Sequence, residues 1–199
     1  MQADRRFNWT DEQEILAQVA DIAFARIIVS TPDGLRVGHA PVIVTDSKRL
    51  RFHLSNHNAL CAHLGQCKAL ILVEGPNAYI SANWYADARG SVPTWNYVAI
   101  ECEGSITQLD QETLAPMLDT LADHMEPKVK QDWTRAKMEP ARFDAMCKAI
   151  TPFEMEIVTL RGTRKLSQNR SHSDLQRVTV ALHALGHTEI ADQMQGMQQ

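Results

Sequence analysis

Aromatic side chains gather in one short stretch of a chain that has few of them. Phe, Trp and Tyr make up 6% of the 199 residues, yet five of them fall within nineteen positions. They are Tyr79, Trp84, Tyr85, Trp95 and Tyr97, and short polar residues accompany them at Ser81, Asn83, Thr94 and Asn96. Flat rings beside hydrogen-bonding groups suit a planar heteroaromatic ligand. The composition fits a second interpretation equally well. The aromatic residues would then lie at a corner of the hydrophobic core, where these polar groups satisfy the Trp N–H and Tyr O–H groups.

A second segment combines cations with neutral hydrogen-bonding side chains just before a predicted helix. It comprises Lys165, Leu166, Ser167, Gln168, Asn169 and Arg170. A phosphate favours this mixture, because Arg donates bidentately, Lys supplies a point charge and helix N-terminal amides lie behind them. The alternative is a solvated loop, with Ser173 or Asp174 capping the helix that follows.

A group of three histidines and a cysteine resembles a metal site only superficially. His53 falls in a predicted strand, His57 in the turn after it and His63 at the end of a short helix. Convergence of these residues with Cys61 on one ion would need a special tertiary arrangement. We therefore expect ordinary polar histidines and no metal.

The P-loop, Rossmann, G-x-S-x-G and H-E-x-x-H motifs are absent from the sequence. Those enzyme classes therefore lack support, and no catalytic residue is identified.

Composition indicates a globular protein without a nucleic-acid-binding charge. Lys and Arg number 20 against 24 Asp and Glu, which gives a formal net charge of -4 and no overall positive field. Four cysteines without a C-x-x-C pair fit reduced thiols. The N-terminal residues do not resemble a secretory signal, and no apolar run approaches the roughly 20 residues of a membrane span. The sequence thus predicts a cytoplasmic protein with no membrane contact.

Hydrophobic spacing predicts hairpins followed by helices. Strands are expected over residues 23–30, 36–45, 50–54, 68–74, 77–81, 95–108 and 153–160. Helices are expected over residues 11–21, 58–64, 111–125, 142–150 and 174–185, with a short polar helix after Gly186. Because no β-α-β alternation occurs, we expect a mainly β, α+β fold: an antiparallel barrel with packed helices. We expect one domain over 1–199, with a helical excursion at 111–150 and C-terminal helices at 171–199.

Several separated motifs together carry a family resemblance. In chain order they are Gly75–Ser81, Trp84–Tyr85, Val92–Tyr97 and Lys165–Arg170. They resemble the PaiB family of FMN-binding negative transcriptional regulators over nearly the whole chain. His39-Ala40-Pro41 resembles the family's His-Leu-Pro strand, and the segment from His53 to Ala59 resembles its His-x-Ala-Arg-x-Asn-Pro segment.

The resemblance implies a fold, a cofactor and a set of site residues. The fold is the split β-barrel of pyridoxamine-phosphate oxidase-like flavoproteins, which dimerise through the barrel and hold FMN where both subunits contribute. The implied cofactor-binding residues are His39, His53, Asn58, Tyr79, Ser81, Trp84, Thr94, Trp95, Asn96, Lys165, Ser167, Gln168, Asn169 and Arg170. Lys165 and Arg170 are implied to bind the phosphate. Asn56 stands where the family has Arg and Ala59 where it has Pro, and one charge-assisted contact is worth about 1.5–3 kcal/mol.

Three functions are compatible with these residues. The first is an FMN-binding regulator whose flavin alters a homodimer, although direct DNA readout lacks support because the C-terminal helix carries only Arg177 besides His172 and His183. The second is a flavin-dependent oxidoreductase using NADH or NADPH, since the cofactor itself carries that chemistry. The third is a dimeric scaffold whose cofactor site has decayed. The motif set favours the flavin-binding regulator.

Overall fold

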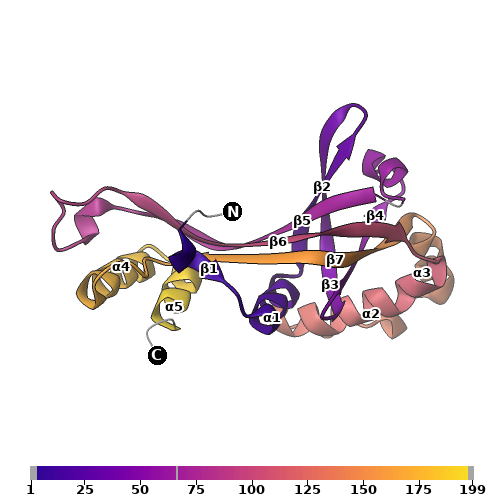
Figure 1. Ribbon diagram of the computed structural model, residues 1–199. Helices are drawn as coiled ribbons and strands as arrows, with labels where there is room; N and C mark the ends of the chain where they lie inside the picture. Colours follow the sequence, from indigo (N-terminus) through magenta and orange to yellow (C-terminus); the bar gives the residue numbers. More distant parts are fainter. Residues whose placement is uncertain (1–3, 66, 197–199) are drawn as a thin grey trace. The chain divides into compact units, whose positions relative to one another are not determined.

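The structure is a computed structural model that describes residues 4–65 and 67–196. The chain forms two compact units (Figure 1). Unit 1 comprises Met1–Thr10, Glu74–Ile100 and Arg161–Gln199, and unit 2 comprises Asp11–Val73 and Glu101–Leu160. Three long strands contribute residues to both units: β5 (Cys67–Ile80), β6 (Thr94–Gln108) and β7 (Ile150–Lys165).

An antiparallel sheet forms the frame of the protein. Within the described residues it has seven strands in the order β1-β7-β4-β3-β2-β5-β6, and β6 also pairs with β7. The sheet therefore closes on itself, while β1 (Asn8–Trp9) extends it beyond β7. The other strands are β2 (Phe24–Thr31), β3 (Gly34–Asp46) and β4 (Arg49–Ser55). The predicted α+β class and split β-barrel are confirmed.

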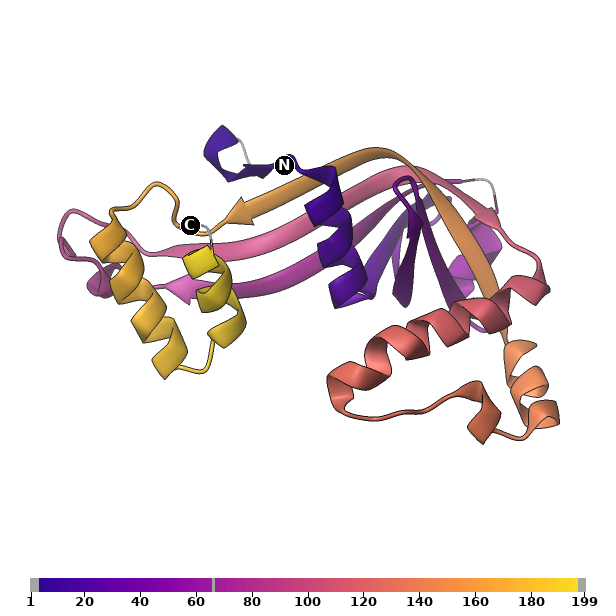
Figure 2. The ribbon, with the colours of Figure 1, turned by 90° about the horizontal axis from the view of Figure 1, so that it is seen from below.

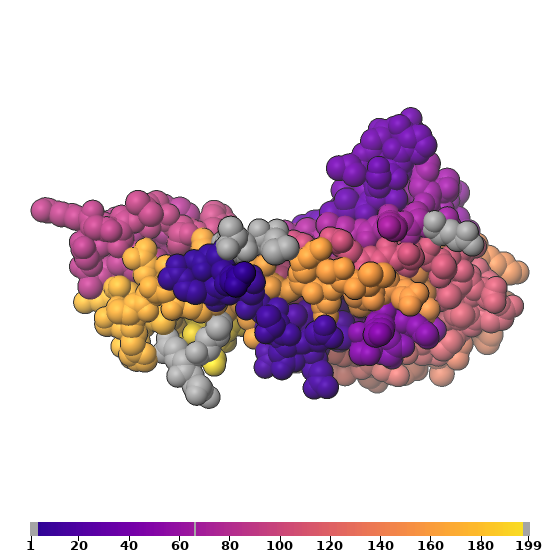
Figure 3. All heavy atoms as spheres, in the orientation of Figure 1, coloured from indigo at the N-terminus to yellow at the C-terminus, as the bar shows by residue number. Residues whose placement is uncertain are grey.

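Strands β2 and β3 form the hairpin predicted at the Thr31–Gly34 turn. Phe24 pairs with Pro41 at one end and Thr31 with Gly34 at the other. Gly34 has a φ of 100°, which residues with a Cβ rarely adopt. The Thr31 hydroxyl donates a hydrogen bond of 2.7 Å to the Gly34 carbonyl. The resulting tip projects from the surface of unit 2 (Figure 3).

Strand alternation decides which side chains of unit 2 fill the barrel. On β4 and β7, Phe52 and Phe153 face inward and are fully buried, and their rings stack with centroids 5.4 Å apart. The intervening residues face outward, where the Arg51 Nε donates to Glu154 Oε2 at 2.7 Å. The period of two that predicted the strand 153–160 therefore sorts core from surface.

Two strand predictions were wrong. The ranges 68–74 and 77–81 are one continuous strand, β5, because Gly75-Pro76 does not interrupt it. The pairing of β5 with β2 covers only Ala69 to Leu72, so Pro76 removes no N–H from that ladder. Strand β7 is also much longer than the predicted 153–160 and extends to Lys165.

The helices form where capping residues start them. The Asp11 carboxylate accepts from the Glu14 N–H at 3.0 Å and begins α1. The Ser171 hydroxyl accepts from the Asp174 N–H and begins α4, so the predicted caps Ser173 and Asp174 were wrong. The α-helices are α1 (Glu12–Ile22), α2 (Leu114–Met125), α3 (Pro140–Cys147), α4 (His172–Ala184) and α5 (Thr188–Gly196). The 3-10 helices are η1 (Arg5–Phe7), η2 (Ala59–His63), η3 (Ala82–Trp84), η4 (Gln111–Thr113), η5 (Glu126–Val129) and η6 (Arg135–Lys137).

Each unit has its own helical layer. In unit 2, α1 and α2 both contact β3. Figure 1 shows α1, α2 and α3 on one side of the unit 2 strands. In unit 1, α4 and α5 pack against each other (Figure 2). No described helix is long and apolar enough to cross a membrane.

The barrel closes so tightly at Gly104 that a side chain has no room there. An ideal Cβ on Gly104 would lie 1.9 Å from the carbonyl oxygen of Glu156 on the neighbouring strand β7. Gly104→Ala must therefore push β6 and β7 apart, and we expect it to lower the free energy of unfolding by about 3 kcal/mol or more in urea titrations. The control is Gly65→Ala, since a Cβ there would meet nothing within 4 Å. Equal stability of the two variants would contradict tight closure.

Candidate functional site

Four predicted site residues meet at the unit 1 ends of β6 and β7. The Lys165 Nζ donates to the Thr94 Oγ1 at 2.7 Å. Asn96 is fully buried, and its Nδ2 donates to the Ser167 Oγ at 2.9 Å. Asn96 and Ser167 thus satisfy each other in the core, whereas Lys165 and Thr94 are only half-buried. Of these four, only Lys165 and Thr94 are not fully buried.

The segment that follows β7 is a fixed turn. The Leu166 N–H donates to the Gln168 Oε1 at 2.7 Å, and the Gln168 Nε2 donates to the Arg164 carbonyl at 2.5 Å. Ser167 has a φ of 64° and is buried, and its carbonyl accepts from the Arg170 N–H at 2.9 Å. The side chain of Gln168 therefore holds the turn, while Asn169 is exposed. The segment is an ordered loop that is partly exposed to solvent, and phosphate binding by it stays a prediction.

Arg170 leaves this turn and lies against the loop between β5 and β6. Its guanidinium carbon is 4.1 Å from the centroid of the Tyr85 ring, and its Nη1 donates to the Ser91 Oγ at 3.3 Å. The nearby Asp174 is engaged elsewhere, because its Oδ1 accepts from the Ala86 N–H at 2.8 Å. That hydrogen bond holds the pKa of Asp174 below its ordinary value. Within the described residues, Arg170 forms no ion pair with an acidic side chain.

Tyr79 and Trp95 form an aromatic pair. Their rings meet edge to face with centroids 6.0 Å apart, and the Trp95 Nε1 donates to the Asn77 Oδ1 at 3.1 Å. Both side chains remain 50% exposed. Because Trp95 lies between Thr94 and Asn96 on a strand, it points to the face of β6 opposite to theirs. The structure therefore does not bring the aromatic pair and the Lys165 group to one face of unit 1.

Ser81 immediately precedes the 3-10 helix η3 of unit 1, and Trp84 is the last residue of that helix. The Ser81 Oγ accepts from the Asn83 N–H at 3.3 Å and caps the helix. Trp84 lines a groove of about 1030 Å³ together with residues of α4, among them His172 and Arg177. Ser81 thus has a local structural contact, and Trp84 faces a groove that the sequence did not indicate.

The remaining predicted site residues belong to unit 2. His39 is exposed and its ring stacks on Phe24, with centroids 6.3 Å apart. Asn58 caps η2, where its Oδ1 accepts from the Leu60 N–H at 3.0 Å. His53 lines an apolar cavity beneath α2 and α3. The three residues therefore lie on different elements of the barrel: β3, the start of η2, and β4.

Asn56, where the resemblance predicts a basic residue, uses both ends of its amide in hydrogen bonds. Its Nδ2 donates to the Lys148 carbonyl at 2.8 Å, and its Oδ1 accepts from the Thr151 Oγ1 at 2.7 Å. Both ends of the amide are used to hold the chain between α3 and β7 against the end of β4. Asn56 therefore has a structural task here and supplies no charge.

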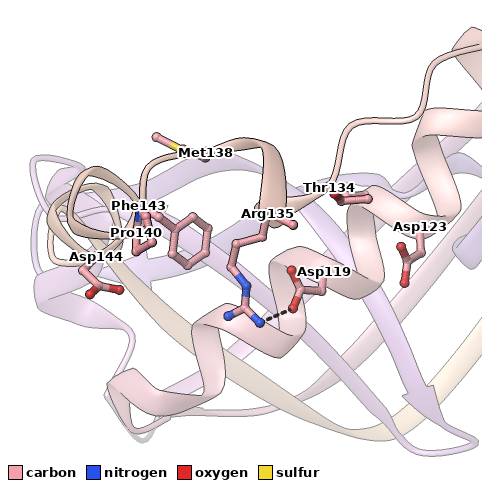
Figure 4. Close-up of a pocket in the computed structure, with 10 residues that line it drawn as sticks. Asp119, Asp123, Thr134, Arg135, Met138, Pro140, Phe143 and Asp144 are labelled. Carbon is pink, nitrogen blue, oxygen red and sulfur yellow. Dashed lines mark ion pairs between the residues drawn. The ribbon is translucent and has the colours of Figure 1, made fainter.

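Two hollows of unit 2 were not foreseen. One is the cavity beside His53, of about 600 Å³, whose walls come mainly from α2, α3 and the segment between them. The other is an open hollow of about 660 Å³ on the outer side of α2, where the Arg135 Nη2 pairs with the Asp119 Oδ2 at 3.0 Å (Figure 4). The sequence pointed to these hollows only indirectly. The methionines and aromatic residues between positions 125 and 146 do not recur at a single helical spacing, so they do not define one apolar helix face. Among residues 4–65 and 67–196, no three His, Cys, Asp or Glu side chains are placed to hold a metal ion.

The burial of His53 gives the stability of the protein a pH dependence. Burial disfavours the imidazolium and lowers the pKa of His53 from its ordinary value of about 6.5. The unfolded chain then binds a proton more readily than the folded chain, so the free energy of unfolding falls as the pH drops below about 6.5. We expect His53→Leu to flatten this fall in urea titrations between about pH 5 and 8. Parallel curves for the two proteins would mean that the folded state does not depress this pKa.

Comparison with known proteins gives the family and the fold. The model of a family described as "Putative FMN-binding domain" matches residues 1–159. The protease synthase and sporulation protein PAI 2 of Bacillus subtilis is 27% identical over 183 residues, which cover 89% of this chain and 87% of that protein.

The FAD and heme binding protein from Mycobacterium smegmatis superposes with a TM-score of 0.61 at 13% identity, over 85% of this chain and 78% of that chain. The flavocytochrome Anf3 from Azotobacter vinelandii superposes with a TM-score of 0.63 at 14% identity, over 88% of this chain and 78% of that chain. The family match spans most of the chain and confirms the PaiB-type resemblance, so the protein belongs to the FMN-binding domain family that its separated motifs indicated.

Proposed function

We propose that the protein binds FMN at the interface of a homodimer and acts as a regulator of the PaiB type. The observation that carries the proposal is the pair of cations in unit 1, Lys165 and Arg170. Each lies beside a hydroxyl, that of Thr94 or Ser91, and neither forms an ion pair with a carboxylate in the described part of the chain. Family membership supplies the identity of the cofactor, whose phosphate these cations would bind.

The residues present fit a phosphate group. A phosphate oxygen needs N–H and O–H donors, and Lys165, Thr94, Arg170 and Ser91 supply both kinds. Arg170 is held by its contact with the Tyr85 ring, so little side-chain freedom is lost on binding. Since Asn56 brings no charge, these two cations would carry the phosphate contact.

The residues also fit a planar ring at a surface between two copies. Tyr79 and Trp95 are half exposed on the face of β6 opposite to Thr94, so their flat faces would stack on a flavin held by a second copy of the chain or pack against that copy. In unit 2, Leu35, Val37 and Val158 are exposed as well. Exposed apolar side chains of this kind support a homodimer. When bound, the flavin supplies the redox chemistry, while the protein binds and orients it.

The regulatory part of the proposal follows the family and the relative named for sporulation. With a net charge of -4, the chain has no general attraction for DNA. We therefore propose that its output comes from a flavin-dependent change of the dimer, acting on another protein. The four cysteines are free thiols, which supports a reducing compartment such as the cytoplasm.

Removing either cation should weaken FMN binding. Arg170→Ala and Lys165→Met each delete one charge-assisted contact, so we expect the dissociation constant for FMN to rise about ten- to a hundredfold. Quenching of flavin fluorescence on titration measures it, and the visible spectrum of the purified protein reports retained flavin. Arg142→Ala is the matched control, because it removes an exposed cation of α3 in unit 2 that contacts neither hydroxyl. Unchanged affinity in both cation variants would place the phosphate elsewhere.

DNA binding offers a test of the regulatory mechanism. In gel-shift titrations from about 50 to 200 mM salt, we expect no complex with DNA from the protein's own control region, with or without FMN. The reason is the net charge of -4, which gives the chain no overall positive field to attract DNA phosphates. A complex that weakens steeply with salt would instead mean direct DNA binding and would reject the protein-mediated route.

A further inference from the structure

The turn between β7 and α4 has an arginine at each end. Arg164 is the residue before the last of β7, and Arg170 precedes the N-cap residue of α4. The turn is closed onto the first of them, because the Gln168 Nε2 donates to the Arg164 carbonyl at 2.5 Å. Lys165 directly follows Arg164 in the chain. The placement of the two arginines therefore decides where the cations of the proposed phosphate site, Lys165 and Arg170, lie.

The N-terminal strand β1 holds the first arginine. Trp9 of β1 pairs with Gly162 of β7, so Arg164 is its diagonal neighbour on the same face of the sheet. The Arg164 guanidinium carbon is 3.2 Å from the centroid of the Trp9 ring, and Trp9 is 8% exposed. Because side chains alternate along a strand, Arg164 and Lys165 point to opposite faces of β7. Trp9 thus braces the end of β7 from the face opposite to Lys165.

Tyr85 holds the second arginine in the same manner. The Arg170 guanidinium carbon is 4.1 Å from the centroid of the Tyr85 ring, and Tyr85 is 3% exposed. Its hydroxyl has no hydrogen-bond partner in the described part of the chain, so the contact with Arg170 is made by the ring. The next residue is fixed as well, since the Ala86 N–H donates to the Asp174 Oδ1 of α4 at 2.8 Å. Both ring contacts lie within unit 1.

An aromatic ring holds a guanidinium without neutralising it. A carboxylate in the same place would compete with a phosphate for the positive charge. A ring contacts the flat face of the guanidinium instead, and the N–H groups, which lie in the guanidinium plane, stay available. Within residues 4–65 and 67–196, the hydrogen bond of Nη1 to the Ser91 Oγ is the one that the Arg170 side chain makes. Arg170 is therefore fixed in direction and keeps donors for an anion.

We propose that Trp9 and Tyr85 are positioning residues of the phosphate site in unit 1. Their buried rings hold Arg164 and Arg170 at the two ends of the turn. The turn then presents Lys165 and Arg170 to an anion in a fixed direction, which lowers the ordering cost of binding. This inference rests on the proposed contact of these two cations with the FMN phosphate. It makes the N-terminal strand, about 150 residues before the turn, part of the support of the site.

A flavin with and a flavin without the phosphate test this role in the full-length protein. Trp9→Leu and Tyr85→Leu each remove one ring, so we expect the dissociation constant for FMN to rise about three- to tenfold and that for riboflavin to change less than about twofold. Quenching of flavin fluorescence measures both. Trp9→Phe and Tyr85→Phe keep a ring and should restore FMN affinity. Equal losses for FMN and riboflavin, or no loss for FMN, would overturn the proposal.

Double-mutant cycles show whether each ring acts through its arginine. In Arg170→Ala, adding Tyr85→Leu should change FMN affinity by less than about twofold, and the same holds for Trp9→Leu added to Arg164→Lys. Additive losses would mean that the rings serve only the general packing of unit 1 and would reject the positioning role. Should circular dichroism find Trp9→Leu unfolded, Arg164→Lys alone gives the answer. Lysine keeps the charge but has no flat face to stack, so it should weaken FMN binding and spare riboflavin.

The cation variants separate this inference from the proposed function. Unchanged FMN affinity in both Lys165→Met and Arg170→Ala would reject the phosphate site and the positioning role together. Weaker FMN binding in those two variants, with unchanged binding in Trp9→Leu and Tyr85→Leu, would overturn the positioning role alone.

Discussion

The closure of the barrel at Gly104 is the constraint on which the rest of the structure depends. Strands β6 and β7 approach so closely there that a carbonyl occupies the place of a Cβ. Once these strands are joined, the pleat of each neighbouring strand is fixed, and the Phe52–Phe153 stack must lie inside. The side chains between the inward ones then face the helices or solvent. This alternation turns His53 toward α2. Among the described residues, the His53 side chain has no hydrogen bond or ion pair that would hold it there.

The same alternation changes how the motif from Val92 to Tyr97 is understood. In the sequence, Thr94, Trp95 and Asn96 are one polar and aromatic group, but on a strand the middle residue points away from its neighbours. Asn96 becomes a buried partner of Ser167, while Trp95 pairs with Tyr79 on the other face. The core-corner alternative holds only for Asn96, because the Trp95 Nε1 donates to Asn77 and the Tyr85 hydroxyl has no hydrogen-bond partner among the described residues, while the ligand-binding alternative stays a prediction. The six residues from Val92 to Tyr97 therefore contribute both to the buried core and to an exposed aromatic surface.

Local signals were sufficient for much of the fold but not for the site. The hairpin at Thr31–Gly34 and the start of α1 follow from turn and cap chemistry that acts within a few residues. Gly75-Pro76 was misleading, because whether a proline ends a strand depends on which neighbour needs its N–H. The contact of Arg170 with Tyr85 and Ser91 joins segments about eighty residues apart. No spacing within one segment could reveal it, and only the resemblance to a family pointed to Arg170.

Asn56, where the family resemblance predicts an Arg, has a structural role in this chain. An Arg at this position would bring a cation to the end of β4, whereas the amide of Asn56 joins the start of β7 to the end of α3. The amide satisfies two polar groups that would otherwise need water. It also ties down the same α3 whose side chains form the wall of the cavity beside His53. Asn56 thus serves the packing of the α3–β7 connection against the end of β4.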